Sequence, residues 1–194
     1  ADLIALSPHR FGGPKGAGVL YRKSRVGVEN LIHGGMQENE RRAGTENVAA
    51  IVGAGVAAKQ AGAALGQAAA DAAKLQARLL DGIRGAVDGV QLNGPEPGDG
   101  RLPHQLSLST EGVEGEGQAL MLDLRGVAIA AGAACTTRSM RLPPALRAIG
   151  RDADLAKGTT LWSIGRDTTE DNVDRAIEQF AVVTAKLRAL SPTN

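Results

Sequence analysis

The chain has 194 residues, of which 43% are hydrophobic and 22% are charged, and its formal net charge at pH 7 is +1. This balance provides no field that would attract nucleic acid or an anionic membrane surface, and aromatic residues, at 2%, are too few for a base-stacking surface. One cysteine and three histidines exclude an intramolecular disulfide and make a structural zinc site unexpected.

The sequence gives no sign of a membrane or secretory protein. No uninterrupted apolar run approaches the roughly 20 residues of a spanning helix, and the first residues lack the charged and apolar regions of a secretory signal. We therefore expect a cytoplasmic protein. The sequence begins "ADLIALS" without a methionine, and its apolar residues are typical of a buried strand. We expect it to start inside a larger protein.

The first predicted segment, residues 1–64, is rich in glycine. "DLIALS" and "GVLYR" are predicted as strands that flank the glycine-rich loop "HRFGGPKGAG". "ENLIHGGMQENERRAGTEN" has no steady period and is predicted as an irregular polar loop. A small-residue helix, "VAAIVGAGVAAKQAGAA", follows, with Thr45 and Asn47 as its candidate caps.

The second predicted segment, residues 65–194, alternates helices and strands. A long amphipathic helix begins near Leu65, and the strands "GVQL", "HQLSLST", "VAIAAG" and "TTLWSIG" follow it. Helices are predicted at "EGQALMLDLRG", near "PPALRAIG", and after "TTED", where Thr168 and Asp171 have the spacing of a capping box. This alternation indicates an α/β protein.

Cys135 is the first candidate for chemistry. It lies in the small-residue sequence "AAGAACTTRSM", where Arg138 and Arg141 would lower the pKa of the thiol and favour the reactive thiolate. The alternative is that a lone cysteine acts only as a small buried hydrophobic residue.

Two glycine-rich or basic stretches are candidates for anion binding. In "SPHRFGGPKG", we expect glycine to free backbone amides beside Ser7 and His9 that could bind a phosphate. In "ERRAGTEN", the side chains of Arg41, Arg42 and Thr45 are of the types that contact anions. Many such turns bind nothing, and two arginines on a loop are commonly just solvated, so neither stretch is decisive alone.

Together these stretches resemble the cysteine desulfurases, in the aminotransferase class V group of pyridoxal-phosphate enzymes. The resemblance rests on four stretches in the family's order, from Asp2 to Ile177: "SPHRFGGPKG", "HGGMQENERRAGTEN", "AAGAACTTRSM" with "LRAIG", and "SIGRDTTEDNVDRAIE". It covers nearly all of this chain but only about the C-terminal half of a full-length desulfurase. It implies a type I pyridoxal-phosphate transferase fold, with residues 1–64 as the end of the large cofactor domain and 65–194 as the small C-terminal domain.

The resemblance also implies roles for single residues. Cys135 matches the nucleophile that takes sulfur from L-cysteine and carries it as a persulfide. Ser7 and His9 match contacts to the cofactor phosphate. Thr45 matches a threonine that reaches the partner subunit's cofactor, which implies a homodimer. The implied cofactor is pyridoxal 5′-phosphate, and no metal is implied.

Two positions depart from the family pattern. Arg10 occupies the position of the Schiff-base lysine, and a guanidinium stays protonated and does not form an imine. Leu161 occupies the position of the arginine that grips the substrate carboxylate, a contact worth about 1.5–3 kcal/mol. The half of the family fold that holds the cofactor ring has no counterpart in these residues. This chain by itself is therefore expected to be incomplete or inactive as an enzyme.

The sequence therefore predicts a cysteine desulfurase-like protein that mobilises sulfur as a Cys135 persulfide for iron–sulfur cluster assembly or tRNA thiolation. Its expected partners are a second copy or a related desulfurase, and a sulfur acceptor or iron–sulfur scaffold protein. The alternative is a non-catalytic pseudo-enzyme that accepts persulfide from an active desulfurase.

Overall fold

The computed structural model describes residues 1–132 and 143–190 of the chain. The chain divides into two compact units, Ala1–Gly66 and Gln67–Asn194. The predicted boundary between residues 64 and 65, and the assignment of the two parts to the domains of an enzyme family, stay predictions.

The first unit begins with two strands, as the sequence predicted, and the structure pairs them in a hairpin. Strands β1 (Leu3–Leu6) and β2 (Val19–Arg22) pair antiparallel, with Leu6 opposite Val19. A short 3₁₀ helix, η1 (Pro8–Phe11), follows β1 and lies in the glycine-rich loop. The polar segment beyond β2 is irregular except for the single turn α1 (Gln37–Glu40), whose residues Glu38 and Asn39 have left-handed backbone angles.

Large apolar side chains of the first unit are exposed on both faces of this hairpin. Leu3 is 46% exposed and Ile4, its neighbour on the opposite face, is 41% exposed. Strands with two apolar faces are typical of sheets that are covered on both sides. The other exposed apolar residues of this unit are Leu6, Val19, Leu20, Tyr21, Val28, Leu31, Ile32, Met36, Val48, Ile51, Val52, Val56 and Leu65.

One continuous helix, α2 (Val48–Ala86), replaces the two helices that the sequence predicted. The predicted break failed because the segment around Ala64 is rich in alanine and has no proline, so nothing in it ends a helix. Of the two predicted caps, Asn47 takes the role: its Oδ1 accepts a hydrogen bond from the Ala50 amide at 3.2 Å.

By length and composition, α2 would suffice to cross a membrane, and 17% of its most apolar 18-residue window is buried. The sequence analysis did not predict such a helix, because polar residues such as Lys59 and Gln67 interrupt its apolar residues. Length and composition are weak support for a membrane span, because core helices of proteins in solution pass the same test. Alanine and glycine, rather than large apolar residues, supply most of the apolar character here.

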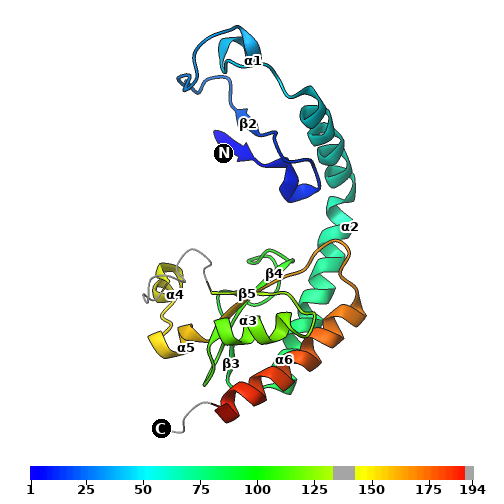
Figure 1. Cartoon of the computed structure of the whole chain (residues 1–194), viewed down its shortest axis with the longest axis vertical. Coiled ribbons are helices and arrows are strands. Elements are labelled where there is room, and N and C mark those ends of the chain that lie inside the picture. The colour runs from blue at the N-terminus through cyan, green and yellow to red at the C-terminus, as the bar shows by residue number, and fades with distance from the viewer. Residues whose placement is uncertain (133–142, 191–194) are drawn as a thin grey trace. The chain divides into compact units, whose positions relative to one another are not determined.

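The second unit is built on a four-stranded sheet whose pairs are all antiparallel (Figure 1). The strand order is β3-β4-β6-β5, so the last strand in sequence lies between β4 and β5. The strands are β3 (Val90–Leu92), β4 (Gln105–Thr110), β5 (Ala130–Ala131) and β6 (Thr159–Ser163). The helices are α3 (Gly115–Asp123), α4 (Pro144–Ala148), α5 (Ala153–Lys157) and α6 (Glu170–Leu190). The sequence predicted each of these except α5.

The hydrophobic core of this unit lies between one face of the sheet and three helices. Trp162 of β6 meets Phe180 of α6 edge to face, with ring centroids 5.4 Å apart and an interplanar angle of 79°. The fully buried Leu122 brings α3 into the same core. The other core residues are Leu79, Leu80, Ile83, Val87, Leu92, Leu106, Leu108, Val173, Ala176 and Val183.

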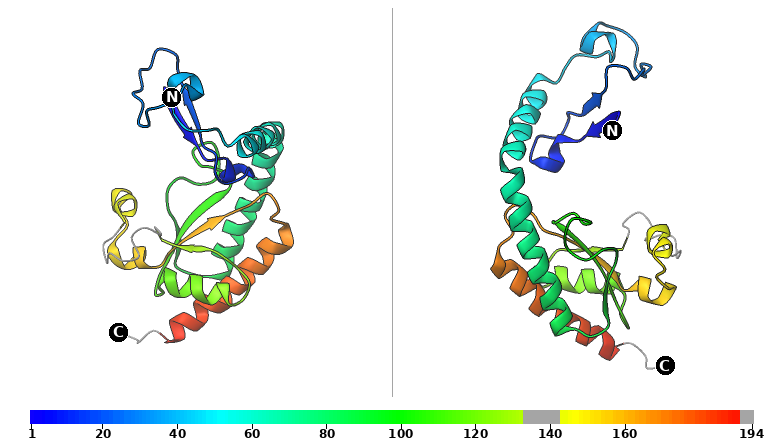
Figure 2. Two further views of the ribbon diagram at one scale, coloured as in Figure 1. Left: turned by 45° about the horizontal axis from the view of Figure 1, so that its top comes forward. Right: turned by 180° about the vertical axis from the view of Figure 1, so that it is seen from behind.

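Helix α6 lies along the part of α2 that belongs to this unit (Figure 2). At the crossing, a Cβ on Gly82 would lie 2.3 Å from Cδ1 of Ile177, so the absent side chain permits close approach. On the exposed side, Arg78 donates two hydrogen bonds of 2.7 Å to the Asp174 carboxylate. The apolar residues that recur at helical spacing in α6 face the core from Val173 to Leu187, whereas Leu190, the last of the series, is 69% exposed.

The capping box of α6 lies one residue beyond the predicted pair. The Thr169 amide donates to Asn172 Oδ1 at 3.1 Å, and the Asn172 amide donates to Thr169 Oγ1 at 3.2 Å. Thr168 instead accepts from the Gly165 amide at 3.0 Å. The predicted pair of Thr168 with Asp171 was therefore wrong by one residue. The two adjacent threonines both fit the sequence pattern, and in the structure Thr169 forms the reciprocal hydrogen bonds, with Asn172.

Candidate functional site

The first cluster of predicted site residues lies in one tight turn. Ser7 precedes η1, and His9 and Arg10 lie within it. All three are exposed, whereas Pro8 is buried. The sequence motif therefore brings these side chains together on the surface of the first unit.

The backbone amides of this turn are used within the turn itself. The Arg10 amide donates to the Ser7 carbonyl at 3.0 Å, and the Gly13 amide donates to the Pro8 carbonyl at 2.8 Å. The Gly12 amide also donates to the Pro8 carbonyl, which the positive φ of 90° at Gly12 permits. The expectation that glycine frees amides here for a phosphate is therefore wrong for residues 10, 12 and 13.

Thr45 lies just before α2, in the same unit, and is exposed. Its neighbourhood is held by the cap at Asn47 and by Pro14, which packs on α2 where a Cβ on Gly53 would lie 2.8 Å from Cγ of Pro14. The glycine-rich loop and the start of α2 are thereby fixed to one another. Ser7 and His9 therefore lie at η1 and Thr45 lies before α2, and the loop that follows η1 packs on α2.

Leu161 is at the centre of β6, in the second unit. It pairs with Ser107 of β4 on one side and with Ala130 of β5 on the other. Its neighbours Thr160 and Trp162 are buried, but Leu161 points to the opposite face and is only half-buried. The position that the resemblance assigns to substrate binding is thus on the sheet face away from the hydrophobic core.

That second face carries a connected set of polar side chains that the sequence analysis missed. Asn93 donates from Nδ2 to Ser107 Oγ at 3.1 Å and to Ser109 Oγ at 2.8 Å. Ser109 Oγ is 2.6 Å from Thr159 Oγ1, and both side chains are buried. Alternating polar residues in β4 and β6 were visible in the sequence, but the strand order that aligns them was not.

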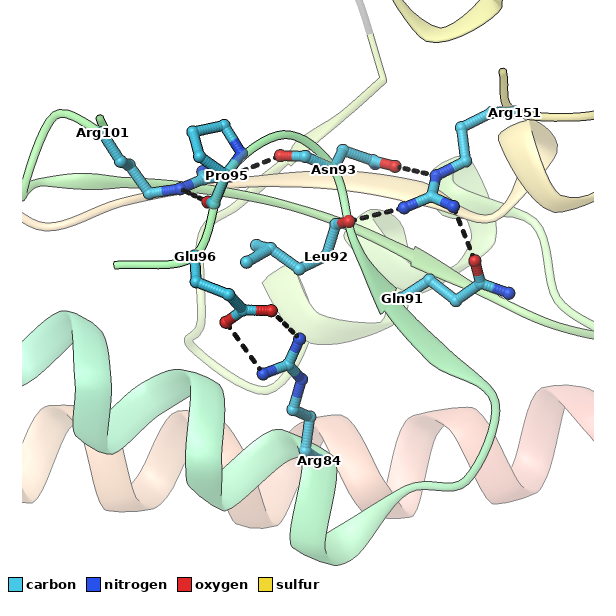
Figure 3. Close-up of polar contacts among 8 residues, drawn as sticks. All are labelled: Arg84, Gln91, Leu92, Asn93, Pro95, Glu96, Arg101 and Arg151. Carbon is cyan, nitrogen blue, oxygen red and sulfur yellow. Dashed lines mark hydrogen bonds and ion pairs between the residues drawn. The ribbon is translucent and has the colours of Figure 1, made fainter. Parts of the chain in front are cut away.

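Two arginines, Arg151 and Arg101, contact Asn93 beside the edge strand β3, and a third, Arg84, contacts the connection that follows β3 (Figure 3). Arg151 reaches Asn93 from the segment between α4 and α5. Arg101 donates to the backbone carbonyls of Pro95 at 2.6 Å and of Asn93, and burial lowers the pKa of its guanidinium. Arg84 of α2 makes a two-bonded contact with Glu96, and the hydrogen bond holds the pKa of the Glu96 carboxyl below its ordinary value.

Cys135 lies outside the described residues, as do Arg138 and Arg141. The described residues on either side of the segment 133–142 are the end of β5 and the start of α4. The Gly132 amide, just before this segment, donates to the Thr159 carbonyl of β6 at 2.8 Å. In residues 1–132 and 143–190, no group of three or more His, Cys, Asp or Glu residues is placed to hold a metal ion.

Comparison with known proteins defines the class. Residues 1–176 match the profile of the aminotransferase class-V family, so the chain belongs to that family. It is 39% identical over 191 residues to the cysteine desulfurase IscS of Clostridium botulinum (strain Hall), a match that covers 98% of this chain and 48% of the relative. It is 44% identical over 193 residues to the cysteine desulfurase IscS of Vibrio cholerae (strain O395), covering 98% of this chain and 46% of the relative.

Solved structures give the same fold. A NifS-like protein superposes with a TM-score of 0.83 at 31% identity, covering 96% of this chain and 47% of that chain. DndA from Streptomyces lividans superposes with a TM-score of 0.61 at 32% identity, covering 84% of this chain and 46% of that chain. The predicted α/β fold of the pyridoxal-phosphate transferases is thereby confirmed. The chain spans about half the length of the curated relatives it matches.

The family depends on pyridoxal 5′-phosphate, but the described residues do not fit covalent attachment of that group at the position that the resemblance assigns to the Schiff-base lysine. Arg10 has no amine that forms an imine, and the amides of its turn are already bonded within the turn. Among the described residues, no side-chain hydrogen bond from Ser7 caps η1. The roles assigned to Ser7, His9, Thr45, Leu161 and Cys135 stay predictions.

Proposed function

We propose that this chain is a cysteine desulfurase-like protein in which Cys135 carries sulfur as a persulfide, for iron–sulfur cluster assembly or tRNA thiolation. The observation that carries the proposal is the match of 98% of the chain, at 39–44% identity, to relatives named cysteine desulfurase. Because the chain spans about half of those relatives, the activity of the whole enzyme is itself part of this proposal.

The sulfur step at Cys135 is a thiol exchange. The Cys135 thiolate attacks the terminal sulfur of a donor persulfide, and a new S–S bond forms while the donor S–S bond breaks. The donor leaves as a thiolate, one sulfur atom is transferred, and no external oxidant or reductant is needed. Cys135 is the only cysteine of the sequence, so a persulfide on it has no second thiol in the chain with which to form a disulfide.

Direct use of L-cysteine as the sulfur source needs more than this chain offers. Pyridoxal phosphate, when bound, supplies the electron sink that allows sulfur to leave cysteine. Arg10 and Leu161 stand where the resemblance places the attachment lysine and the carboxylate-binding arginine. We propose that the chain by itself is incomplete or inactive in desulfuration.

The same two residues favour a second candidate function, that of a non-catalytic pseudo-enzyme that accepts persulfide from an active desulfurase. Such a protein needs the thiol and a surface for association, but neither the lysine nor the carboxylate-binding arginine. Exposed apolar side chains on both faces of the β1–β2 hairpin support association with a further polypeptide, whether a second copy or a related desulfurase. The cytoplasmic location and the sulfur acceptor stay predictions.

Two assays on the intact chain test these functions. In the first, the chain is incubated with an active desulfurase and L-cysteine, and Cys135 is examined by mass spectrometry for one added sulfur atom. Cys135→Ser is the control, and labelling that persists in this variant would contradict sulfur transfer to Cys135. In the second, the chain alone is given pyridoxal phosphate and L-cysteine, alanine is measured, and borohydride reduction with peptide mapping locates any lysine adduct.

The outcomes separate the two candidates. Persulfide on Cys135 without alanine formation supports the accepting role. Alanine formation with an adduct on one specific lysine supports a desulfurase with a relocated attachment site. If neither persulfide nor alanine forms, both candidate functions are contradicted.

A further inference from the structure

The outer edge of strand β3 is bound by a side chain from a distant part of the second unit. β3 is the first strand in the order β3-β4-β6-β5, so among the described strands it pairs with β4 alone. Arg151, between α4 and α5, donates from Nη2 to the Leu92 carbonyl. Its Nε donates to Asn93 Oδ1 and its Nη1 donates to Gln91 Oε1, each at 2.7 Å. Figure 3 shows the guanidinium against these three consecutive residues.

The Leu92 carbonyl is one of the backbone groups of β3 that are not used by β4. The Asn93 amide donates to a carbonyl of β4 at 2.8 Å, and the Gly89 carbonyl accepts from the amide just beyond β4 at 3.0 Å. In an antiparallel pair such bonds recur at every second residue, so Gly89, Gln91 and Asn93 face β4. The amide and carbonyl groups of Val90 and Leu92 are therefore directed to the outer edge.

Arg151 closes this edge. An unpaired strand edge is a template for another strand, and proteins commonly cover such edges or place charges on them. The bond from the guanidinium to the Leu92 carbonyl has a charged donor, which makes it stronger than a bond between neutral groups. Leu92 is 6% exposed although it lies on an edge strand. Arg151 thus occupies an acceptor that an added strand would need.

The strand that best complements this edge is β3 of a second copy. Val90 and Leu92 are two residues apart, so a two-fold axis beside Gln91 would place Val90 of each copy opposite Leu92 of the other. Each of these pairs would exchange two amide-to-carbonyl hydrogen bonds, as hydrogen-bonded pairs of antiparallel strands do. Half of the bonds would be accepted by the Leu92 carbonyls, which are the groups that Arg151 binds.

We infer that Arg151 prevents self-association through β3: by binding the Leu92 carbonyl it keeps β3 from pairing with β3 of a second copy. Its charge adds to the effect, because the two-fold pairing would bring the Arg151 side chains of both copies to the same edge. The inference concerns an interaction surface and is independent of the proposed sulfur chemistry. It rests on the contacts of β3 and Arg151, all of which lie among the described residues.

The test compares self-association of the intact chain with that of three variants. Arg151→Ala removes the hydrogen bonds and the charge, and Arg151→Lys keeps a cation at the edge. Arg84→Ala is the matched control, because Arg84 makes two hydrogen bonds to the Glu96 side chain rather than to the backbone of β3. Sedimentation velocity gives the dissociation constant of the dimer. Hydrogen exchange at low and high protein concentration, read by mass spectrometry, locates the amides that association protects.

We expect Arg151→Ala to lower the dissociation constant by at least about tenfold, the factor that corresponds to one charge-assisted hydrogen bond. Exchange in residues 88–93 should then slow as the protein concentration rises, whereas wild type and Arg84→Ala should show no such dependence there. Arg151→Lys should lower the dissociation constant by a smaller factor. Association through the exposed apolar residues of the β1–β2 hairpin is distinguished from this effect, because it would protect residues 3–22 equally in all four proteins.

Concentration-independent exchange in residues 88–93 of Arg151→Ala would overturn the inference, as would a tighter dimer whose protected amides lie elsewhere. An equal change in Arg84→Ala would also overturn it. An equal change in Arg151→Lys would show that loosening of the α4–α5 segment, rather than loss of the cation at the edge, is responsible, and would overturn it too. Should Arg151→Ala fail to fold, Arg151→Gln removes the charge with a longer side chain, and the same expectations and the same contrary outcomes apply to it.

Discussion

Leu161 and Ala130 lie directly opposite each other in the antiparallel pair β5–β6. The residue at the predicted substrate position is therefore the neighbour of the short strand that leads to the segment containing Cys135. Two residues later, the Gly132 amide is bonded to the Thr159 carbonyl of the same strand β6. A substitution at position 161 therefore changes a residue that is paired with Ala130, two residues before Gly132.

An arginine at position 161 should be tolerated by the fold. Leu161 is half-buried on the face away from the core, so Leu161→Arg can direct its charged end to water, and we expect it to lower the free energy of unfolding by less than about 1 kcal/mol. The control is Trp162→Arg, one residue along the strand, where the side chain is 4% exposed and packs on Phe180. In that variant the free energy of unfolding should fall by more than about 3 kcal/mol, because an unpaired charge is buried in the core.

Circular dichroism during urea unfolding is the appropriate measurement for this pair, since Trp162 is the only tryptophan and its fluorescence is lost in the control. Similar losses in the two variants would contradict the assignment of their side chains to opposite faces of β6.

Gly158 should resist substitution for a steric reason. It is buried, its carbonyl accepts from the Thr110 amide at 3.1 Å, and a Cβ on it would lie 2.0 Å from the Thr110 carbonyl oxygen. Because that oxygen belongs to the backbone of the central strand β4, Gly158→Ala should destabilise the protein by about 1–3 kcal/mol.

The control is Gly85→Ala in α2, where a Cβ meets no atom within 4 Å. Alanine is the better helix former, so this variant should be more stable by about 0.5–1 kcal/mol. Chemical denaturation of both proteins measures the two changes, and equal stability of Gly158→Ala and wild type would mean that β4 and the end of α5 are not in contact.

Thr169, rather than Thr168, should be the residue whose loss weakens the start of α6. Thr169→Ala removes one half of the reciprocal pair with Asn172, and we expect a loss of about 1 kcal/mol. Thr168→Ala removes an acceptor only from the Gly165 amide, which is exposed and bonds to water instead, so its loss should be smaller. Thermal unfolding midpoints rank the two variants, and the reverse order would restore the capping box that the sequence predicted.

Acid should weaken the contact between α2 and α6. The hydrogen bond from Arg78 holds the pKa of the Asp174 carboxyl below its ordinary value. A lowered pKa in the folded state means that the pair stabilises the protein above the unfolded carboxyl's pKa, about 3.9, and that this contribution is lost as the pH falls through the folded value. Asp174→Asn should therefore flatten the decline in stability below about pH 5.

Arg78→Met, which removes the other member of the pair, should flatten the decline in stability at acid pH in the same direction. Urea midpoints measured from neutral to acid pH, at low and high salt, give the comparison, and high salt should shrink the difference because both side chains of the pair are exposed. An unchanged acid limb in Asp174→Asn would show that the pair has no pH-dependent effect on stability.

The local elements of this protein follow from short stretches of its sequence. Period-2 alternation in "HQLSLST" predicted β4, and "TTLWSIG" was also predicted as a strand and forms β6. Apolar residues at helical spacing from Val173 to Leu190 predicted α6, because one buried face imposes that period on the chain. The family was also evident from four ordered motifs, since each motif needs only adjacent residues. The continuity of α2 was not evident from the sequence. Alanine and glycine give a weak periodic signal, which does not distinguish one long helix from two.

The contacts between distant parts of the sequence were decided by the tertiary structure alone. Arg151 and Asn93 are 58 residues apart, and only the fold of the second unit, with the strand order β3-β4-β6-β5, brings the guanidinium to the Asn93 side chain. The capping register of α6 was likewise settled by geometry, since two adjacent threonines satisfy the same pattern. Composition and spacing specify which residues carry chemical groups, whereas hydrogen bonds across a sheet depend on pairing and register, which neighbouring residues in the chain do not encode.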